Sequence, residues 1–148
     1  YCGLRISAVL ALPWKNVDCT GDHLRINIIM QKTRQPLYLP LSMQARKWMP
    51  ERGGAAEDDP VFATLPCEDT CNVQLKPWVK EAGITKHVTY HVSRHTFATM
   101  MLTLGADLYT VCKLLGHTDV KTTQIYAKII KKKKDDAIGL IDTEFANT

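Results

Sequence analysis

The feature that most constrains the fold is a run of helical segments over residues 89–128, separated by residues that begin or end helices. Helical spacing of apolar residues predicts a first buried face, formed by Phe97, Met101, Leu102 and Leu104. Gly105 is typical of the position just after a helix. Asp107 predicts the start of a second helix that Gly116 ends, and Asp119 predicts the start of a third. The stretch therefore predicts three short helices around a shared core.

The same segments carry side chains suited to chemistry on an anion. Three of the five histidines fall here, namely His91, His95 and His117, beside Arg94 and Tyr126. An arginine donates two parallel hydrogen bonds to a phosphate. His91 lies three positions before Arg94, so on one helix both side chains face the same way. A tyrosine oxygen is a known covalent nucleophile, whereas we expect His95 to pack beside the site and orient a neighbour.

Three motifs in this chain resemble those of the tyrosine recombinases, the lambda-integrase family. Residues 91–95 read His-Val-Ser-Arg-His, as in the family pattern His-x-x-Arg-His. Residues 115–117 read Leu-Gly-His, and Tyr126 follows nine positions after the histidine. Residues 3–7 read Gly-Leu-Arg-Ile-Ser, similar to the family's first arginine motif. The motifs occur in the family's order and cover nearly all of the chain.

The resemblance implies an α+β fold that is mainly α-helical, a recombinase catalytic domain with a small antiparallel sheet or hairpin at one edge. It implies that residues 1–148 are a single catalytic-domain fragment, with a helical DNA-binding domain missing upstream. Residues 131–148 would be a C-terminal tail. Its apolar stripe of Ile138, Ile141 and Phe145 would dock as a helix on the next protomer of a DNA-bound tetramer.

Two extended segments predict the hairpin. Leu24, Ile26 and Ile28 share one face of a strand over residues 23–30. Residues 36–41 form a second segment whose prolines indicate an edge strand. The residues between them are polar and basic. From composition alone, an exposed turn and a functional basic site fit this segment equally well. By the resemblance, Lys32 best matches the family's catalytic lysine, and Arg34 is the alternative, with a contact to the DNA backbone as its expected role.

The remaining elements follow from caps and apolar spacing. Residues 4–12 predict a helix with Arg5 near its start, and Ser42 predicts the N-cap of another that runs to about Trp48. Residues 50–59 predict a loop, and residues 60–65 a short extended piece. Residues 69–82 predict a helix that ends before Gly83. Its core-facing residues would be Val73, Leu75, Trp78 and Val79, and the alternative for Trp78 is a platform on which a base stacks.

Composition limits the class of protein. A 45% hydrophobic and 23% charged chain is ordinary for a globular domain, and no apolar run approaches the roughly 18 residues of a membrane span. The net charge of +4 permits a nucleic-acid partner. The five irregularly spaced cysteines predict free thiols in a reducing cytoplasm rather than a zinc site. We expect no metal and no cofactor. Four consecutive lysines, Lys131, Lys132, Lys133 and Lys134, fit a solvated face or a contact with DNA equally well.

The resemblance also assigns roles. Arg5, Arg94 and His117 would stabilise the charge that develops on a phosphodiester. Tyr126 would attack phosphorus and form a 3′-phosphotyrosine. An unperturbed tyrosine pKa is about 10, so a base must take the proton. His91 is the candidate base, and Lys32 would protonate the leaving 5′-oxygen.

One departure from the family keeps alternatives open. The family has Glu or Asp three residues after its first arginine, where this chain has Ala8. The leading interpretation is a site-specific recombinase or integrase that acts on double-stranded DNA in the bacterial nucleoid, as a tetramer on DNA or as a monomer when it is a fragment. The alternatives are a type IB topoisomerase-like nicking and closing enzyme, or a DNA-binding relative that has lost catalysis.

Overall fold

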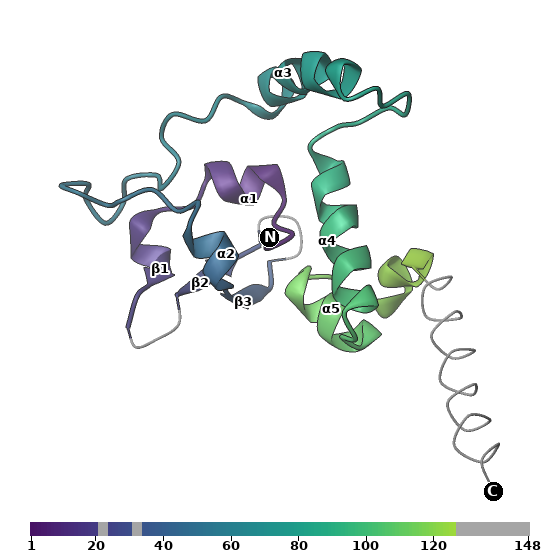
Figure 1. Cartoon of the computed structure of the whole chain (residues 1–148). Helices are drawn as coiled ribbons and strands as arrows, with labels where there is room; N and C mark the ends of the chain where they lie inside the picture. Colours follow the sequence, from purple (N-terminus) through teal and green to yellow (C-terminus); the bar gives the residue numbers. More distant parts are fainter. Residues whose placement is uncertain (21–23, 31–33, 127–148) are drawn as a thin grey trace, which may run out of the picture.

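A computed structural model describes residues 1–20, 24–30 and 34–126 (Figure 1). It combines short helices with one small antiparallel sheet, as the sequence predicts. The elements in chain order are α1 (Ile6–Leu10), the 3-10 helix η1 (Trp14–Asn16), β1 (Val17–Asp18), β2 (Arg25–Ile29), β3 (Pro36–Pro40), α2 (Met43–Arg46), α3 (Glu68–Glu81), α4 (His91–Thr103), α5 (Leu108–Leu114) and the 3-10 helix η2 (Val120–Tyr126).

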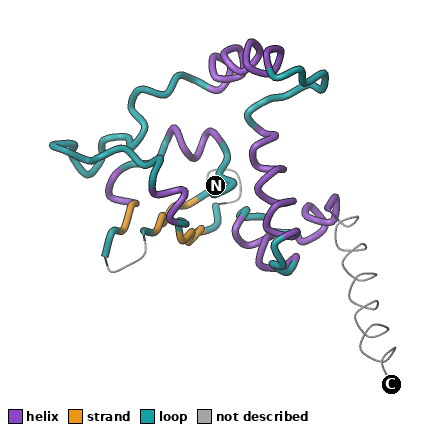
Figure 2. Tube along the Cα trace, in the orientation of Figure 1, coloured by secondary structure: helices purple, strands orange, loops and turns teal. Residues whose placement is uncertain are grey.

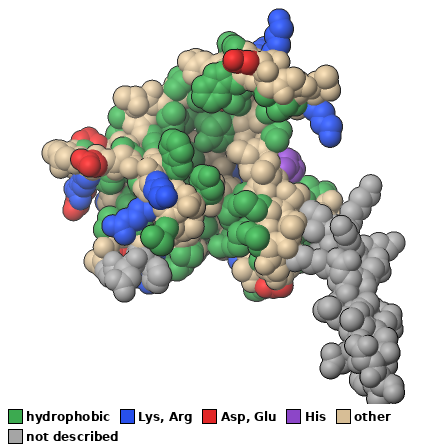
Figure 3. Space-filling model, in the orientation of Figure 1, with side chains coloured by type: hydrophobic (Ala, Val, Ile, Leu, Met, Phe, Trp, Pro, Cys, Tyr) green, Lys and Arg blue, Asp and Glu red, His purple; other side chains and the backbone are tan. Residues whose placement is uncertain are grey.

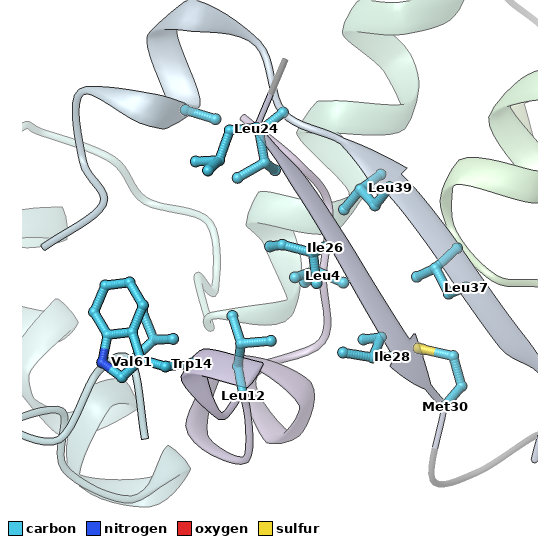
Figure 4. Packing of buried hydrophobic residues seen from close by; sticks show 12 residues of the cluster. Leu4, Leu12, Trp14, Leu24, Ile26, Ile28, Met30, Leu37, Leu39 and Val61 are labelled. Carbon is cyan, nitrogen blue, oxygen red and sulfur yellow. The ribbon is translucent and has the colours of Figure 1, made fainter. Parts of the chain in front are cut away.

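The sheet has the strand order β1-β2-β3, with both pairs antiparallel. Ile26 lies opposite Leu39, and Ile28 lies opposite Leu37. These side chains point to the same buried face because alternate residues of a strand share a face. Figure 4 shows them packed with Leu4 and Leu12. β3 pairs only with β2, so its two prolines lie on an edge strand as predicted.

The helix boundaries follow the predicted caps. The Ser42 hydroxyl accepts a hydrogen bond from the Ala45 backbone N–H at 3.1 Å, and α2 begins at the next residue. Asp107 accepts from the Thr110 N–H at 2.9 Å and starts α5 in the same way. Asp119 accepts from the Lys121 N–H at 2.8 Å just before η2. A side-chain oxygen at each start therefore satisfies a backbone donor that the helix leaves free.

Two hydrophobic cores meet at the first motif. The sheet core packs α1, η1 and the strands, and the helical core packs α4, α5 and η2. Gly3 lies between them with a φ of +62°, and a Cβ at this position would lie 2.4 Å from the Phe97 Cδ1 atom. Only a glycine combines this backbone conformation with so close an approach. Gly3 thus allows the first motif to pack directly against α4.

The helix α3 differs from the prediction. Trp78 is 73% exposed and Val73 is 58% exposed, so the expectation that they face a core is wrong. Figure 2 shows why: long loops precede and follow α3 and hold it apart from the sheet. The apolar pattern was sufficient to identify a helix, and Gly83 does follow its end with a φ of +67°. It carried no information on which element lies opposite.

Smaller differences concern chain segments near the cores. Leu104, predicted to be buried, is the C-cap residue of α4 and is 75% exposed, so that prediction is wrong. Residues 61–64 form turns instead of an extended piece, and only Pro60 makes an isolated bridge, to Pro13. No sequence pattern indicated η1 or β1, and the two residues of β1 are too few to show a period.

The face in Figure 3 has hydrophobic side chains across its middle, and Lys and Arg side chains form separate groups beside them and at the rim. An apolar groove of about 420 Å³ opens on the sheet core, lined by residues that include Tyr1, Leu41, Trp48 and Phe62. Within the described part of the chain, no helix has the length and the apolarity needed to cross a membrane.

Candidate active site

Arg94 is the structural centre of the candidate site. It lies one turn into α4, and only 3% of it is exposed. Its Nη1 donates a hydrogen bond to the Gly3 carbonyl at 2.6 Å, and its Nη2 donates one to the Leu115 carbonyl. Gly3 belongs to the first motif and Leu115 to the third. One buried guanidinium therefore joins all three motifs, across 91 residues of sequence in the case of Gly3.

A small cleft of about 90 Å³ brings Arg5, His91 and Arg94 together. Arg5 enters it from the N-cap position of α1, and His91 from the first residue of α4. Burial, followed by the neighbouring Arg5, lowers the pKa of Arg94 to about 10, so Arg94 remains charged at neutral pH. The cleft thus concentrates positive charge, which suits an anionic ligand.

Arg5 has a buried nitrogen without a hydrogen-bond partner. Among the described residues, its Nη1 is the only buried side-chain N or O atom in this state. Ala8 lies three positions later and lines a pocket of about 420 Å³ with Arg5. The methyl group of Ala8 accepts no hydrogen bond, so Ala8 cannot supply the partner that the Arg5 nitrogen lacks.

Two histidines of the site, His91 and His117, have lowered pKa values. Burial, then His95, Arg94 and Arg5, lower the pKa of His91. His117 follows the Gly116 turn, and burial, then Arg94 and Arg5, lower its pKa to about 4. A proton on either ring would add a charge beside two arginines, which is unfavourable unless an anion is bound.

His117 is oriented by a buried threonine. Its Nδ1 is 3.0 Å from the Thr123 hydroxyl, and Thr123 is fully buried in η2. The Nδ1 bond leaves the other ring nitrogen, Nε2, for a ligand. Six positions separate the two residues, and the sequence analysis missed Thr123, because no local pattern marks a threonine as a histidine's partner.

Tyr126 is the last residue of η2. Its ring packs in the helical core, and its oxygen forms a hydrogen bond with a histidine. Its side chain is 7% exposed and packs with the core residues Phe97, Leu102 and Leu115. The phenolic oxygen is 2.6 Å from Nδ1 of His95. Burial raises the pKa of Tyr126, and the charge of Arg94 opposes that shift more weakly. His95 thus orients a neighbour, as expected, and the neighbour is the residue predicted to be the nucleophile.

The structure gathers five of the six predicted catalytic residues: Arg5, His91, Arg94, His117 and Tyr126. Lys32 lies outside the described residues, as do Lys131, Lys132, Lys133 and Lys134. Arg34 is exposed with a φ of 54°, and its N–H donates to the Met30 carbonyl at 2.8 Å in the turn after β2. That exposure is compatible with its predicted contact. Glu68, at the start of α3, also lines the small cleft and was not foreseen.

No group of three or more His, Cys, Asp or Glu side chains that could hold a metal ion occurs within residues 1–20, 24–30 and 34–126. All five cysteines of the chain are free thiols.

Comparison with known proteins gives consistent matches. The model of the phage integrase family matches residues 1–133. Tyrosine recombinase XerD of Pseudomonas putida is 33% identical over 144 residues, covering 89% of this chain and 47% of that protein. Tyrosine recombinase XerC of Xylella fastidiosa is 35% identical over 135 residues, covering 86% of this chain and 45% of that protein. The chain thus spans about half the length of these relatives.

Solved structures share the fold. XerH site-specific recombinase, in a post-cleavage complex with its palindromic difH substrate, superimposes with a TM-score of 0.73 at 22% identity, covering 96% of this chain and 43% of that one. XerA recombinase superimposes with a TM-score of 0.69 at 26% identity, covering 93% and 53%.

Proposed function

The chain belongs to the phage integrase family of tyrosine recombinases, and on that premise we propose that it is the catalytic part of a site-specific DNA recombinase. It cleaves one DNA strand at a time through a 3′-phosphotyrosine and rejoins the strand to a new partner. The observation that supports this most directly is the pair of Arg94 hydrogen bonds to Gly3 and Leu115, which unites the three motifs around one cationic cleft.

The cleft binds the scissile phosphate. Arg94 donates two N–H groups to backbone carbonyls. A guanidinium has five N–H donors, so further donors remain for phosphate oxygens. Arg5 faces the same cleft. As phosphorus is attacked, negative charge grows on the non-bridging oxygens. Fixed cations therefore stabilise the transition state more strongly than the ground state. His117 donates from the nitrogen that Thr123 leaves free.

Tyr126 is the nucleophile in this proposal. Its oxygen bonds to phosphorus, the 3′-phosphotyrosine forms, and the leaving 5′-oxygen takes a proton from Lys32. A 5′-hydroxyl of a second DNA strand then attacks the phosphotyrosine. The covalent link conserves the energy of the phosphodiester, so no nucleotide cofactor takes part. Neither a metal nor another cofactor is required, because the cationic side chains supply the charge.

The partner is double-stranded DNA, recognised first through its backbone charge. Arg34 and the four lysines from Lys131 to Lys134 are the proposed backbone contacts outside the cleft. The complete reaction uses four protomers on DNA in the bacterial nucleoid, with residues 131–148 docking on a neighbour. Sedimentation of the DNA complex would count the protomers, and a complex that stays monomeric at every concentration would contradict this.

The decisive experiment is covalent capture. A nicked duplex is first selected from a random-sequence pool by the wild-type chain, then labelled and incubated with each variant. Tyr126→Phe removes only the hydroxyl, so the ring should still pack and DNA binding should stay near wild type, while the covalent band disappears. Tyr109→Phe is the matched control, because Tyr109 is 61% exposed on α5. A band that persists in Tyr126→Phe would show that another residue is the nucleophile.

The same gel tests the alternative of a relative that has lost catalysis. The unpaired Arg5 nitrogen, together with Ala8 in the pocket that Arg5 also lines, is the observation that favours it. That alternative predicts DNA binding without any covalent band from the wild-type chain.

A further inference from the structure

We propose that His95 is a further catalytic residue, whose Nδ1 accepts the phenolic proton of Tyr126 while that oxygen attacks DNA. The inference rests on the proposed function, since it assumes that Tyr126 is the nucleophile. It replaces His91 as the expected base.

The geometry places His95 on the reacting atom. Nδ1 of His95 and the Tyr126 oxygen are 2.6 Å apart, a distance at which a proton passes directly. The two rings have centroids 5.9 Å apart and are tilted by 59°. Among the described residues, His95 is the only hydrogen-bond partner of this hydroxyl.

His91 occupies a different position. It lies one turn earlier on α4, and its ring meets the edge of the His95 ring with centroids 4.9 Å apart. It lines the small cleft with Arg5 and Arg94, where the phosphate is expected. The His91 ring therefore faces the ligand, whereas the His95 ring faces the nucleophile. The sequence could not separate these roles, because both residues fall in the same five-residue motif.

The environment of Tyr126 creates the need for a base. Its ring is 7% exposed in the helical core, and burial raises the pKa of its hydroxyl. The oxygen is therefore protonated at neutral pH and is a weak nucleophile until the proton is removed. The helix α4 holds the acceptor firmly, because the residue next to His95 is the buried Arg94 with its two carbonyl bonds.

The step balances as follows. The Tyr126 O–H bond breaks and its proton goes to Nδ1, so His95 becomes an imidazolium. The freed electron pair forms the bond to phosphorus. The bond from phosphorus to the 5′-oxygen breaks, and that oxygen leaves with the electron pair and takes a proton from a separate acid, Lys32 in the proposed function. During rejoining, the imidazolium returns the proton to the departing tyrosine oxygen.

The first test compares substitutions at His95 in single-turnover cleavage of the selected nicked duplex. His95→Asn places an amide where Nδ1 lies, so it keeps a hydrogen bond to Tyr126 but takes no proton. We expect it to slow covalent capture by about 10²-fold or more, with DNA binding unchanged. Added imidazole should restore part of the rate in His95→Ala. His87→Asn, at an exposed histidine before α4, is the control.

The pH profile gives a signature that a purely structural role would not produce. His95→Asn should change how the cleavage rate depends on pH, because its amide cannot take up a proton, whereas a change in packing alone should lower the rate equally at every pH. The other charged or titratable groups around the cluster remain the same in both proteins: Arg5, Glu68, Tyr90, His91, Arg94, His117 and Tyr126.

A different result would overturn the proposal. Cleavage by His95→Asn at the wild-type rate would show that no proton passes to this ring. Faster cleavage by His95→Ala would show that the hydrogen bond restrains Tyr126 rather than activating it. Absence of any covalent product from the wild-type chain would instead overturn the proposed function.

A second measurement needs no DNA. Nitrogen-15 NMR of the histidine-labelled chain reports which ring nitrogen of His95 carries hydrogen, with His95→Asn used to assign the signal. We expect the neutral ring to carry hydrogen on Nε2, which leaves Nδ1 free to accept from Tyr126. Hydrogen on Nδ1 of the neutral ring would make the Tyr126 oxygen the acceptor, and the proposal would be wrong.

Discussion

At the scale of single residues, the two arginines of the cleft differ in what holds them. Arg94 is almost fully buried and donates to two backbone carbonyls, whereas Arg5 is half-buried and has a nitrogen with no partner among the described residues. Both are predicted to bind the same phosphate. We therefore expect folding to depend on Arg94, and ligand binding rather than folding to depend on Arg5.

Substitution of each arginine should separate stability from rate. Arg94→Ala removes two hydrogen bonds from a charged donor and leaves the Gly3 and Leu115 carbonyls buried without a partner, at about 1.5–3 kcal/mol each. Arg94→Lys should recover only part of the stability lost in Arg94→Ala, because a single ammonium group replaces a planar guanidinium that reaches two carbonyls. Arg5→Gln should lower the cleavage rate by ~10²–10³-fold and leave stability near wild type. Urea unfolding measures the first effect and single-turnover capture the second.

The expected contrast has a clear failure. If Arg94→Ala unfolds at the same urea concentration as the wild-type chain, the two carbonyl bonds contribute nothing to the fold. The site would then be held together by the packing of its helices alone.

At the scale of elements, local patterns were enough for most boundaries. Alternation identified β2, and Ser42 and Asp107 marked their helices because a cap satisfies its own neighbours. What failed was non-local. The apolar residues of α3 identified a helix but not its exposure. The bond from Arg94 to Gly3 joins residues 91 positions apart, and the one from His95 to Tyr126 joins residues 31 apart. No spacing rule covers such pairs, and the family motifs assigned roles to Arg94 and Tyr126 without naming Gly3 or His95 as their partners.

The packing of the first motif against α4 gives a prediction with a matched control. Gly3 and Gly83 have φ values of +62° and +67°, but only Gly3 has atoms within 4 Å of an added Cβ. Gly83→Ala should cost about 1–2 kcal/mol from the left-handed backbone alone. Gly3→Ala should cost clearly more, because Phe97 must move and Arg94 then loses its carbonyl partner. The difference between the two losses in free energy of unfolding measures the contact of residue 3 with Phe97. Equal losses would show that Phe97 and α4 move aside without cost.

At the scale of the whole molecule, like charges collect at one place. Arg5 and Arg94 share a cleft, and the pKa values of His91 and His117 are lowered beside them. The free chain therefore carries an electrostatic cost in the region where the sheet core and the helical core meet. A bound phosphate would remove that cost, so ligand binding and the stability of the chain should be linked.

That linkage predicts how stability depends on pH. The pKa of His117 falls from 6.5 to about 4 on folding. Between these two pH values, the unfolded chain binds a proton at His117 and the folded chain does not. Stability is then fully present above about pH 6.5 and declines as the pH falls toward 4.

Sulfate or phosphate should raise the midpoint of thermal unfolding, and should raise it more at pH 5 than at pH 8, because a bound anion allows the histidines to charge. Arg5→Gln should weaken this anion effect without changing the decline that His117 causes. Thermal unfolding of both proteins at the two pH values measures it, and an anion effect equal in both would place the anion away from this cleft.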